Sequence, residues 1–566
     1  MFYDFIFANS SRDADFFLKI LIREAHHFNL TAAFYALDSQ THFIVLDVPA
    51  LMAHITTSET DDSSRQRILE FSQQISLKLP LSLYFRFLEI KPIVPNETFY
   101  TLFEQNHNPI QCLQETLGLP LCDIAHDEII LEPKTYYFDA LETRQILDSS
   151  SDFYAQPNTA SFNQKLLLPP DFSSFLNHAI DELCNHQPII LHTQYGIKTL
   201  SLQPLPQNQM CVACDIASLK TYFRIHQAQI DALASFEKPS VCLVPKEVFQ
   251  QNFPQNPKGE VLVSLPYDII LALIGAKLLQ KDIDYFFLSY AEQGLSQPFD
   301  FRHSILPAQQ ILCVAQNGVF IDTSIKGKDL SSLVSAHIAQ EEPSQRTLVI
   351  YLSTRHSSVF MVCDSGISRS MLDIAFETNP RLIIEDIIQS YESGKDLVDN
   401  FNHITHNQAL KLLNLSPKSH ISHNLTDLFA TAAQILNFTD SDDMMQCKNT
   451  LFALANTFVR DRGPRIDFHL LKDQQNTLTL DYNRAIRSSL SFKCAQMENV
   501  ILAYGFLDSM SEFVATLIRD TQINFEIKRT LLLGDMLSNA IFLDRLLGYL
   551  PKNINLILPK DGLMDY

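Results

Sequence analysis

One pair of cysteines in the chain has the spacing of metal ligands, Cys211-Val212-Ala213-Cys214. A structural zinc site needs four ligands, and these usually come as two such pairs. No second pair lies near this one, and the stretch around it has the pattern of a strand. We therefore interpret Cys211 and Cys214 as ordinary apolar thiols, with half a zinc site as the alternative.

Phosphate-binding loops depend on glycine, which lets a phosphate approach the backbone closely. Glycine occurs only 14 times in 566 residues, well below the usual share of about 7%. The chain contains no GxGxxG, GxxxxGK[ST] or GxSxG motif. This composition disfavours the common nucleotide-binding enzymes. The local basic cluster Arg460, Arg462 and Arg465 could contact an acidic partner, but turns of this kind are usually just exposed.

The charge balance limits the partners of the chain. It has 43 Lys and Arg against 64 Asp and Glu, a formal net charge of −21, so phosphate backbones and anionic lipids repel it. The longest apolar run, 269–274, is far shorter than a membrane span. The N-terminus lacks a basic signal region, and scattered cysteines suit a reducing compartment. We expect a cytoplasmic protein with no membrane span and no nucleic-acid partner.

The first 92 residues predict a small domain that mixes helices and strands. Apolar residues recur with helical period over 14–28 and 65–77, and strand patterns flank these two segments. The predicted strands are 3–7, 31–35, 42–46 and 82–90. The order β-α-β-β-α-β is the split βαβ arrangement.

Three further regions follow, so we expect a multidomain α/β (α+β) chain. Proline-rich residues 93–165 predict a connecting module. Residues 166–304 mix strands with helices such as 267–279, and residues 305–566 begin with strands and continue with helices. Expected helices of the last region are 382–392, 425–437 and 445–459.

Three segments of the last region match the motifs of one family in order and spacing. Leu425–Leu436 is similar to M-G-R-L-F-D-A-V-A-A-L-L, and Ile466–Leu471 to Y-P-F-E-L. Leu531–Asn539 with Phe542–Leu547 is similar to V-A-L-S-G-G-V-F-Q-N followed by L-L-x-R-L-L. Leu558–Gly562 resembles the family's L-P…N-D-G-G. The region therefore resembles the C-terminal half of HypF-type carbamoyltransferases, which make the cyanide ligands of [NiFe] hydrogenase.

The rest of the chain is similar to the same architecture. The first 92 residues resemble the acylphosphatase domain of HypF, and residues 166–304 its YrdC-like domain, through Ala213-Cys214-Asp215, Lys238-Pro239 and Leu265-Pro266-Tyr267. The resemblance assigns residues 305–566 to the actin/sugar-kinase-like superfamily. It implies partners among the hydrogenase subunits or other hydrogenase maturation proteins.

The residues that would handle acyl phosphate and nucleotide are replaced. Asp15 stands where the acylphosphatase motif has its phosphate-binding Arg, and Ala36 near the position of its Asn. The basic run before Lys238-Pro239 becomes the stretch 231–237, which contains two acids. Lys220 and Arg224 could substitute in part, or could be exposed helix charges. No zinc is expected at Cys112 and Cys122, which form no C-x-x-C pair.

The last site of the family binds a metal through H-x-H and a distant Asp, beside Gly-rich loops. The resemblance leaves His337 and Asp561 as metal ligands, because Ser335 replaces the other His. A satisfied or surface histidine is the alternative for His337. Gly534 and Asn539 remain as cofactor-binding candidates, although Asp535 follows Gly534 in place of the second Gly.

The D-G-T-G loop becomes Ser353–His356, with no glycine, and Gln446 replaces the Glu of Y-E-G-Q. No catalytic residue is therefore assigned, and no cofactor is expected beyond residual nucleotide or a divalent metal.

We expect a HypF-like pseudoenzyme, an accessory protein in [NiFe]-hydrogenase maturation that acts by protein binding. The alternative from another class is an active carbamoyltransferase that uses carbamoyl phosphate and ATP to supply the cyanide ligands. A general assembly factor unrelated to hydrogenase is a third reading, because a fold does not determine a function.

Overall fold

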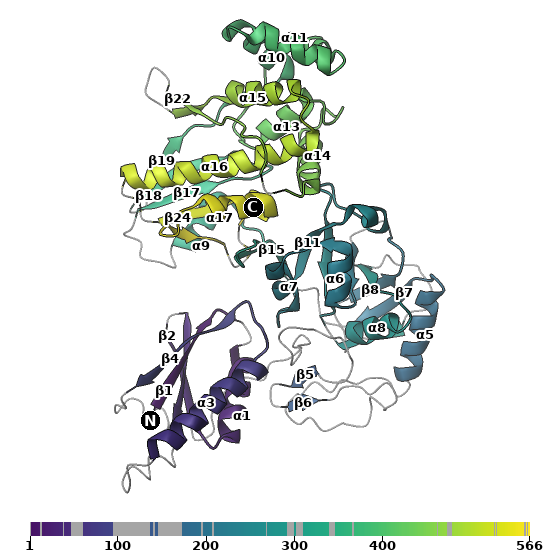
Figure 1. Cartoon of the computed structure of the whole chain (residues 1–566), viewed down its shortest axis with the longest axis vertical. Helices are drawn as coiled ribbons and strands as arrows, with labels where there is room; N and C mark the ends of the chain where they lie inside the picture. Colours follow the sequence, from purple (N-terminus) through teal and green to yellow (C-terminus); the bar gives the residue numbers. More distant parts are fainter. Residues whose placement is uncertain are drawn as a thin grey trace. The chain divides into compact units, whose positions relative to one another are not determined.

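The computed structural model divides into two compact units, and Figure 1 colours their helices and strands by position in the sequence. Unit 1 comprises residues 1–222, 230–240 and 262–309, and unit 2 comprises 223–229, 241–261 and 310–566. The structure describes residues 2–11, 14–37, 39–46, 60–93, 136–139, 142–144, 172–193, 196–205, 209–267, 269–290, 299–300, 310–338, 346–364, 367–460, 462–472, 478–525, 527, 529–559, 562 and 564–566. The predicted α/β multidomain class is confirmed. The predicted domain boundaries at 92, 165 and 304 stay a prediction.

The N-terminal part of unit 1 has the predicted β-α-β-β-α-β order. Its elements are β1 (Phe2–Asn9), α1 (Ala14–His27), β2 (Thr31–Leu37), β3 (Gln40–Leu46), α3 (Thr60–Lys78) and β4 (Phe85–Ile93). The strands form an antiparallel sheet in the order β2-β3-β1-β4. Alternate residues of β1, such as Phe5 and Phe7, face a core rich in phenylalanine, which replaces the missing tryptophan as bulky filler.

A second sheet of unit 1 carries the region that resembles the YrdC-like domain. Its neighbouring strands run β14-β7-β8-β13-β9-β12. Their bounds are β7 (Ile189–Thr193), β8 (Gly196–Ser201), β9 (Gln209–Ala213), β12 (Val261–Ser264), β13 (Tyr285–Tyr290) and β14 (Phe299–Asp300). The helices in this part of the sequence are α5 (Phe172–Cys184), α6 (Ile216–Tyr222), α7 (Gln227–Ala234) and α8 (Ile269–Leu279). The predicted helix at 267–279 is thus confirmed two residues shorter. Between residues 93 and 165 the structure describes only β5 (Tyr136–Asp139) and β6 (Glu142–Arg144), so Cys112 and Cys122 lie outside the described residues.

The centre of unit 2 is a sheet in the order β19-β18-β17-β24-β25. The strands are β17 (Thr347–Tyr351), β18 (Val359–Asp364), β19 (Ile367–Leu372), β24 (Arg529–Leu533) and β25 (Asn555–Ile557). β17 and β24 pair in parallel, with Tyr351 opposite Leu533. Because parallel strands end at the same edge of a sheet, the loops that follow β17 and β24 meet there.

Helices and short strands complete unit 2. The helices are α9 (Leu330–Ile338), α10 (Pro380–Ser390), α11 (Gly394–Ile404), α12 (Gln408–Leu413), α13 (Asp427–Ile435), α14 (Met444–Thr457), α15 (Tyr482–Cys494), α16 (Asn499–Phe525) and α17 (Ala540–Tyr549). The expected helices at 382–392, 425–437 and 445–459 correspond to α10, α13 and α14. The short strands are β10 (Phe223–Arg224), β11 (Ser240–Pro245), β15 (Ile311–Val314), β16 (Phe320–Asp322), β20 (Phe376–Glu377), β21 (Ile421–Ser422), β22 (Leu470–Lys472) and β23 (Leu478–Leu480).

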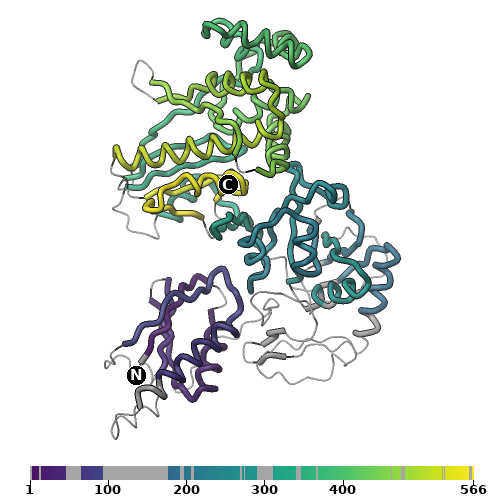
Figure 2. The backbone as a smooth tube through the Cα atoms, viewed as in Figure 1, coloured from purple at the N-terminus to yellow at the C-terminus, as the bar shows by residue number. Residues whose placement is uncertain are grey.

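Among the described helices, α16 alone has the length and apolar character of a membrane span, and Figure 2 traces it as one long helix. Of its most apolar window, 72% is buried inside the fold. It packs against α14 and α17, and Leu507, Met510 and Val514 lie in the core of unit 2. The burial of α16 in this core accounts for its apolar composition.

Candidate functional site

Two loops at the edge of the central sheet of unit 2 are joined by an acidic side chain. Asp535 begins the short 3₁₀ helix η3 (Asp535–Ser538), directly after β24 and Gly534. Its carboxylate accepts hydrogen bonds from the backbone N–H and the Oγ1 hydroxyl of Thr354, both at 2.5 Å. Thr354 lies in the loop after β17, where the family resemblance places a glycine-rich nucleotide loop. A carboxylate therefore holds the backbone donor that a phosphate would need.

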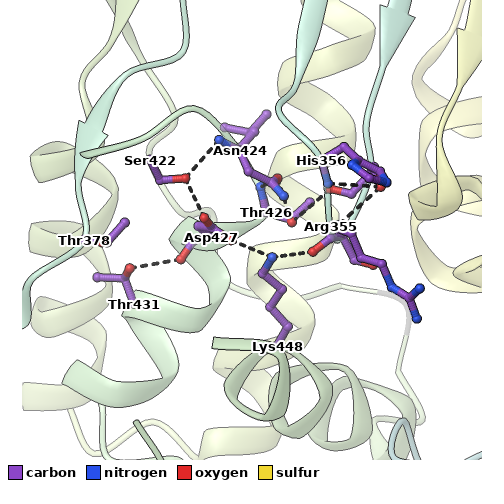
Figure 3. A network of polar contacts seen from close by, with 12 residues as sticks. Arg355, His356, Thr378, Ser422, Asn424, Thr426, Asp427, Thr431 and Lys448 are labelled. Atoms are coloured by element: carbon purple, nitrogen blue, oxygen red, sulfur yellow. Dashed lines mark hydrogen bonds and ion pairs between the residues drawn. The ribbon is translucent and has the colours of Figure 1, made fainter. Parts of the chain in front are cut away.

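A buried ammonium group reinforces the same loop from the other side (Figure 3). Lys448 on α14 is only 2% exposed. Its Nζ donates to the carbonyl oxygen of Thr354 at 2.5 Å and forms an ion pair with Asp427 Oδ1 at 2.5 Å. Ser422 Oγ donates to the other carboxylate oxygen of Asp427. Thr426, which precedes Asp427, donates to the carbonyl oxygen of Ser353 at 3.2 Å. These contacts hold the loop 353–356 in place through the charges of Lys448 and Asp427.

Residues 564–566 cover the remaining side of the loop. The backbone N–H of Gly534 donates to the Met564 carbonyl at 2.6 Å. The Asp565 carboxylate accepts hydrogen bonds from Tyr351 Oη and from Ser353 Oγ. The Tyr566 ring stacks on the imidazole of His356, with centroids 4.2 Å apart. Burial raises the pKa of Asp565 above its usual range, because it disfavours the charged carboxylate.

The two residues predicted to bind a cofactor lie at this edge, and both have structural roles there. Gly534 has φ +103°, and a Cβ at this position would lie 1.9 Å from the carbonyl oxygen of Leu352. Asn539 caps α17, because its side chain accepts a hydrogen bond from the backbone N–H of Phe542 at 3.0 Å. The side-chain amide nitrogen of Asn539 is buried and has no acceptor among the described residues. Their binding of a cofactor stays a prediction.

The predicted metal ligands form no complete site in the described chain. His337 lies in the last turn of α9 and is 8% exposed, while Asp561 is outside the described residues. Over the residues that the structure describes, no group of three His, Cys, Asp or Glu side chains is arranged to hold a metal. A zinc ion in a protein needs at least three protein ligands. The donor set present in the described chain does not fit such an ion, and a metal at His337 and Asp561 stays a prediction.

Phe236, an aromatic residue of the stretch 231–237, packs against α1 close to Asp15, where the resemblance places the phosphate-binding Arg. Phe236 stacks on Phe16 at 4.6 Å between ring centroids and contacts Phe17 edge-on at 5.1 Å. Both partners follow Asp15 in α1. Ala36, which replaces the family's Asn, is exposed at the end of β2. Phe236 thus packs beside the residues to which the resemblance assigns phosphate binding.

A partly buried carboxylate fixes this contact. Glu237 accepts hydrogen bonds from Ser82 Oγ at 2.5 Å and from the backbone N–H of Leu83 at 3.0 Å. The backbone N–H of Phe236 donates to the Leu81 carbonyl at 2.7 Å. Burial raises the pKa of Glu237, and the hydrogen bonds from Ser82 and Leu83 oppose the shift. The stretch that lost its basic residues therefore serves as an internal anchor for the first domain.

We expect Phe236→Ala to destabilise the N-terminal part of unit 1 by about 3–5 kcal/mol, the usual cost of removing a buried aromatic ring. Hydrogen–deuterium exchange of α1 measures the effect, and its amides should exchange faster. Phe525→Ala is the matched control, because Phe525 is 55% exposed and surface truncations change stability by about 0.5 kcal/mol or less. Equal protection of α1 in the two variants would contradict a stabilising role for the Phe236 stack.

Arg224 caps a helix within unit 2. The sequence had suggested that it could substitute in part for the missing phosphate-binding residues. Its guanidinium donates to the carbonyl oxygens of Asn456 at 3.2 Å and Thr457 at 2.8 Å. These carbonyls end α14, where the unpaired oxygens and the helix dipole favour a cation. Arg224 is thus a capping residue of α14, whereas Lys220 is exposed on α6.

Cys211 and Cys214, the pair with metal-ligand spacing, lie at the end of β9. Both thiols are buried in unit 1, at 1% and 0% exposure. Burial raises the pKa of each well above its usual value, and among the described residues no third His, Cys, Asp or Glu joins them to form a metal-binding group. This environment agrees with the interpretation as apolar thiols.

The polar network at the edge of the sheet was not predicted in full. Asp535 and the loop 353–356 were singled out as replacements, whereas the Lys448–Asp427 pair was missed. In the motifs quoted above, Asp427 stands in place of an Arg and Lys448 in place of a Gln. Relative to these motifs, an acid appears at position 427 and a base at position 448. These two opposite changes in charge could have identified the pair.

The comparisons with known proteins agree with this architecture. No family model matches the chain. Protein HydE of Wolinella succinogenes is 28% identical over 579 residues, which cover 100% of both chains. A crystal structure of full-length HypF in the phosphate- and nucleotide-bound form superimposes with a TM-score of 0.50 and 11% identity, over 99% of this chain and 96% of the other. HypF from T. kodakarensis gives a TM-score of 0.49 and 12% identity over the same shares.

The structural neighbour shares the fold at very low identity, and the sequence relative extends along the whole chain. The predicted resemblance to HypF is confirmed at the level of the fold. The chain is therefore similar to Protein HydE over its full length and has the HypF fold.

Proposed function

We propose that this protein is a cytoplasmic accessory factor in [NiFe]-hydrogenase maturation or assembly. In this proposal it binds a hydrogenase subunit or another maturation protein, and it needs neither nucleotide nor a metal cofactor. The HypF fold and the full-length similarity to Protein HydE support a place among hydrogenase maturation proteins.

The observation that carries the pseudoenzyme part of the proposal is the pairing of Asp535 with Thr354. The carboxylate accepts both donors of Thr354, in the loop where the resemblance expects a nucleotide phosphate. An incoming phosphate would have to displace these bonds and then face the Asp535 charge at short distance, which is strongly unfavourable in a partly buried site. Lys448, which donates to the Thr354 carbonyl, is also bound to Asp427.

ATP–pyrophosphate exchange in the presence of carbamoyl phosphate tests the absence of catalysis. We expect the purified protein to give no exchange above background, while an authentic HypF assayed in parallel is active. Exchange above background would favour the active carbamoyltransferase instead. It would also mean that the loop around Thr354 rearranges to admit a nucleotide.

A deletion strain tests the maturation role independently of catalysis. We expect loss of the gene to lower [NiFe]-hydrogenase activity, and a plasmid-borne copy to restore it. Affinity purification of the tagged protein should enrich a hydrogenase subunit or a maturation protein relative to an untagged strain. Normal hydrogenase activity in the deletion strain would remove the basis of the proposal, whatever the exchange assay shows.

A further inference from the structure

Unit 2 contains a cavity of about 220 Å³ next to the loops that Asp535 joins. Residues of β11, β15, the loop after β17 and η3 contribute to its lining. Pockets for drug-sized ligands usually measure about 300–1,000 Å³. The cavity is therefore too small to enclose a nucleotide, but it has room for a small metabolite.

The acidic side chains of the lining already have hydrogen-bond donors from the chain. Asp535 accepts from Thr354, and Asp565 accepts from Tyr351 and Ser353. Glu260 accepts from Asn256 Nδ2 at 3.2 Å and from Asn456 Nδ2 at 3.4 Å. Burial also raises the pKa of both Glu260 and Asp565, which lowers their tendency to present negative charge to the cavity.

The basic side chains of the lining are engaged less fully, although the Lys258 charge acts on the nearby Glu260 and, in opposition to burial, lowers the pKa of that carboxyl. They are Lys258, Lys326 and Arg355, and none of them has an ion pair with a carboxylate among the described residues. The Lys258 ammonium lies 5.7 Å from the centre of the Phe452 ring. In Figure 3 the Arg355 guanidinium is directed away from the Lys448 network. The cavity thus has positive charge available for a ligand at Lys258, Lys326 and Arg355, whereas the Asp535 carboxylate is held by Thr354 at the loop and the pKa of Glu260 and of Asp565 is raised.

We propose that this cavity binds a small organic dianion of the dicarboxylate class. Two carboxylates of such a ligand can pair with two of the three cations, and its short carbon chain can lie on the apolar wall that Val241, Leu312 and Val314 provide. A monoanion would leave the cations less well neutralised, and a nucleotide exceeds the volume. The inference goes beyond the proposed function, because a small ligand and a protein partner are bound separately.

Isothermal titration calorimetry of the full-length protein tests the proposal with disodium succinate, inorganic phosphate and ATP as probes. All titrations use the same ionic strength, set with sodium chloride. We expect saturable binding of succinate at one site, with weaker binding of inorganic phosphate and of ATP. Tighter binding of ATP or of inorganic phosphate than of succinate would overturn the dicarboxylate class, and no binding of any probe would overturn the site.

Single substitutions locate the bound anion. Lys258→Gln and Arg355→Gln should each weaken succinate binding by about tenfold or more, because each removes a charge-assisted contact. Lys395→Gln is the matched control, since Lys395 is exposed on α11 and does not line the cavity. Circular dichroism and the melting temperature without ligand verify the fold of each variant. Unchanged affinity in both cavity variants would place the anion elsewhere and contradict the proposal.

Discussion

Gly534→Ala should prevent the stable folding of unit 2 and lower the melting temperature of the protein by about 10 °C or more. The new Cβ would lie 1.9 Å from the carbonyl oxygen and 2.3 Å from the carbonyl carbon of Leu352. These atoms belong to the backbone at the end of β17, so no side-chain rotation can relieve the clash. In addition, φ +103° at position 534 is strained for any residue with a side chain.

Differential scanning fluorimetry and limited proteolysis of the full-length variant measure this effect. Gly548→Ala is the matched control, because no atom lies within 4 Å of a Cβ added there and the residue belongs to α17. We expect the control to be neutral or more stable by up to about 1 kcal/mol. A Gly534→Ala variant as stable as the control would contradict the clash with the backbone of Leu352.

Lys448→Met should destabilise unit 2 by about 3–5 kcal/mol, the usual cost of removing one partner of a buried ion pair. The substitution leaves the Asp427 carboxylate and the Thr354 carbonyl without the ammonium that they share. The methionine is of similar length, so the loss of charge and hydrogen bonding dominates over the loss of volume. Chemical denaturation followed by fluorescence of the 18 tyrosines checks the result.

Lys411→Met provides the control for Lys448→Met, because Lys411 is an exposed lysine on α12. Its effect should stay within about 0.5 kcal/mol. The double variant Asp427→Asn with Lys448→Met should recover part of the lost stability, since neither charge is then left unpaired. An equal loss in the single and double variants would mean that Asp427 and Lys448 act independently.

The fold of the first domain could be predicted from local patterns. The alternation of apolar residues in β1 and the helical period of apolar residues in α1 and α3 each lie within one continuous segment of the sequence. All six predicted elements were confirmed. The contact of Phe236 with this domain could not be predicted in the same way. About 150 residues separate Phe236 from β4, and no periodic pattern connects a single aromatic residue with a distant core.

The candidate site shows the same limit. The missing glycines at 353–356 and the acid at 535 are visible in the sequence, because they interrupt motifs of known spacing. The Lys448–Asp427 pair depends on the packing of α14 against α13, which brings together residues 21 positions apart. Asn539 was predicted to bind a cofactor because the motif retains it. An asparagine that caps a helix would be retained in the same way, so the sequence alone does not distinguish the two roles.

The anchoring of Phe236 has a consequence for the order of events during protein synthesis. The last strand of the first domain leaves the ribosome at Ile93, whereas the ring that completes the core is still to be translated. At about 5–20 residues per second, the delay between the two is about 7–30 s. During this interval the nascent domain exposes Phe16 and Phe17, which offers a binding opportunity to a chaperone. A chain that stalls before residue 236 should therefore remain bound to one.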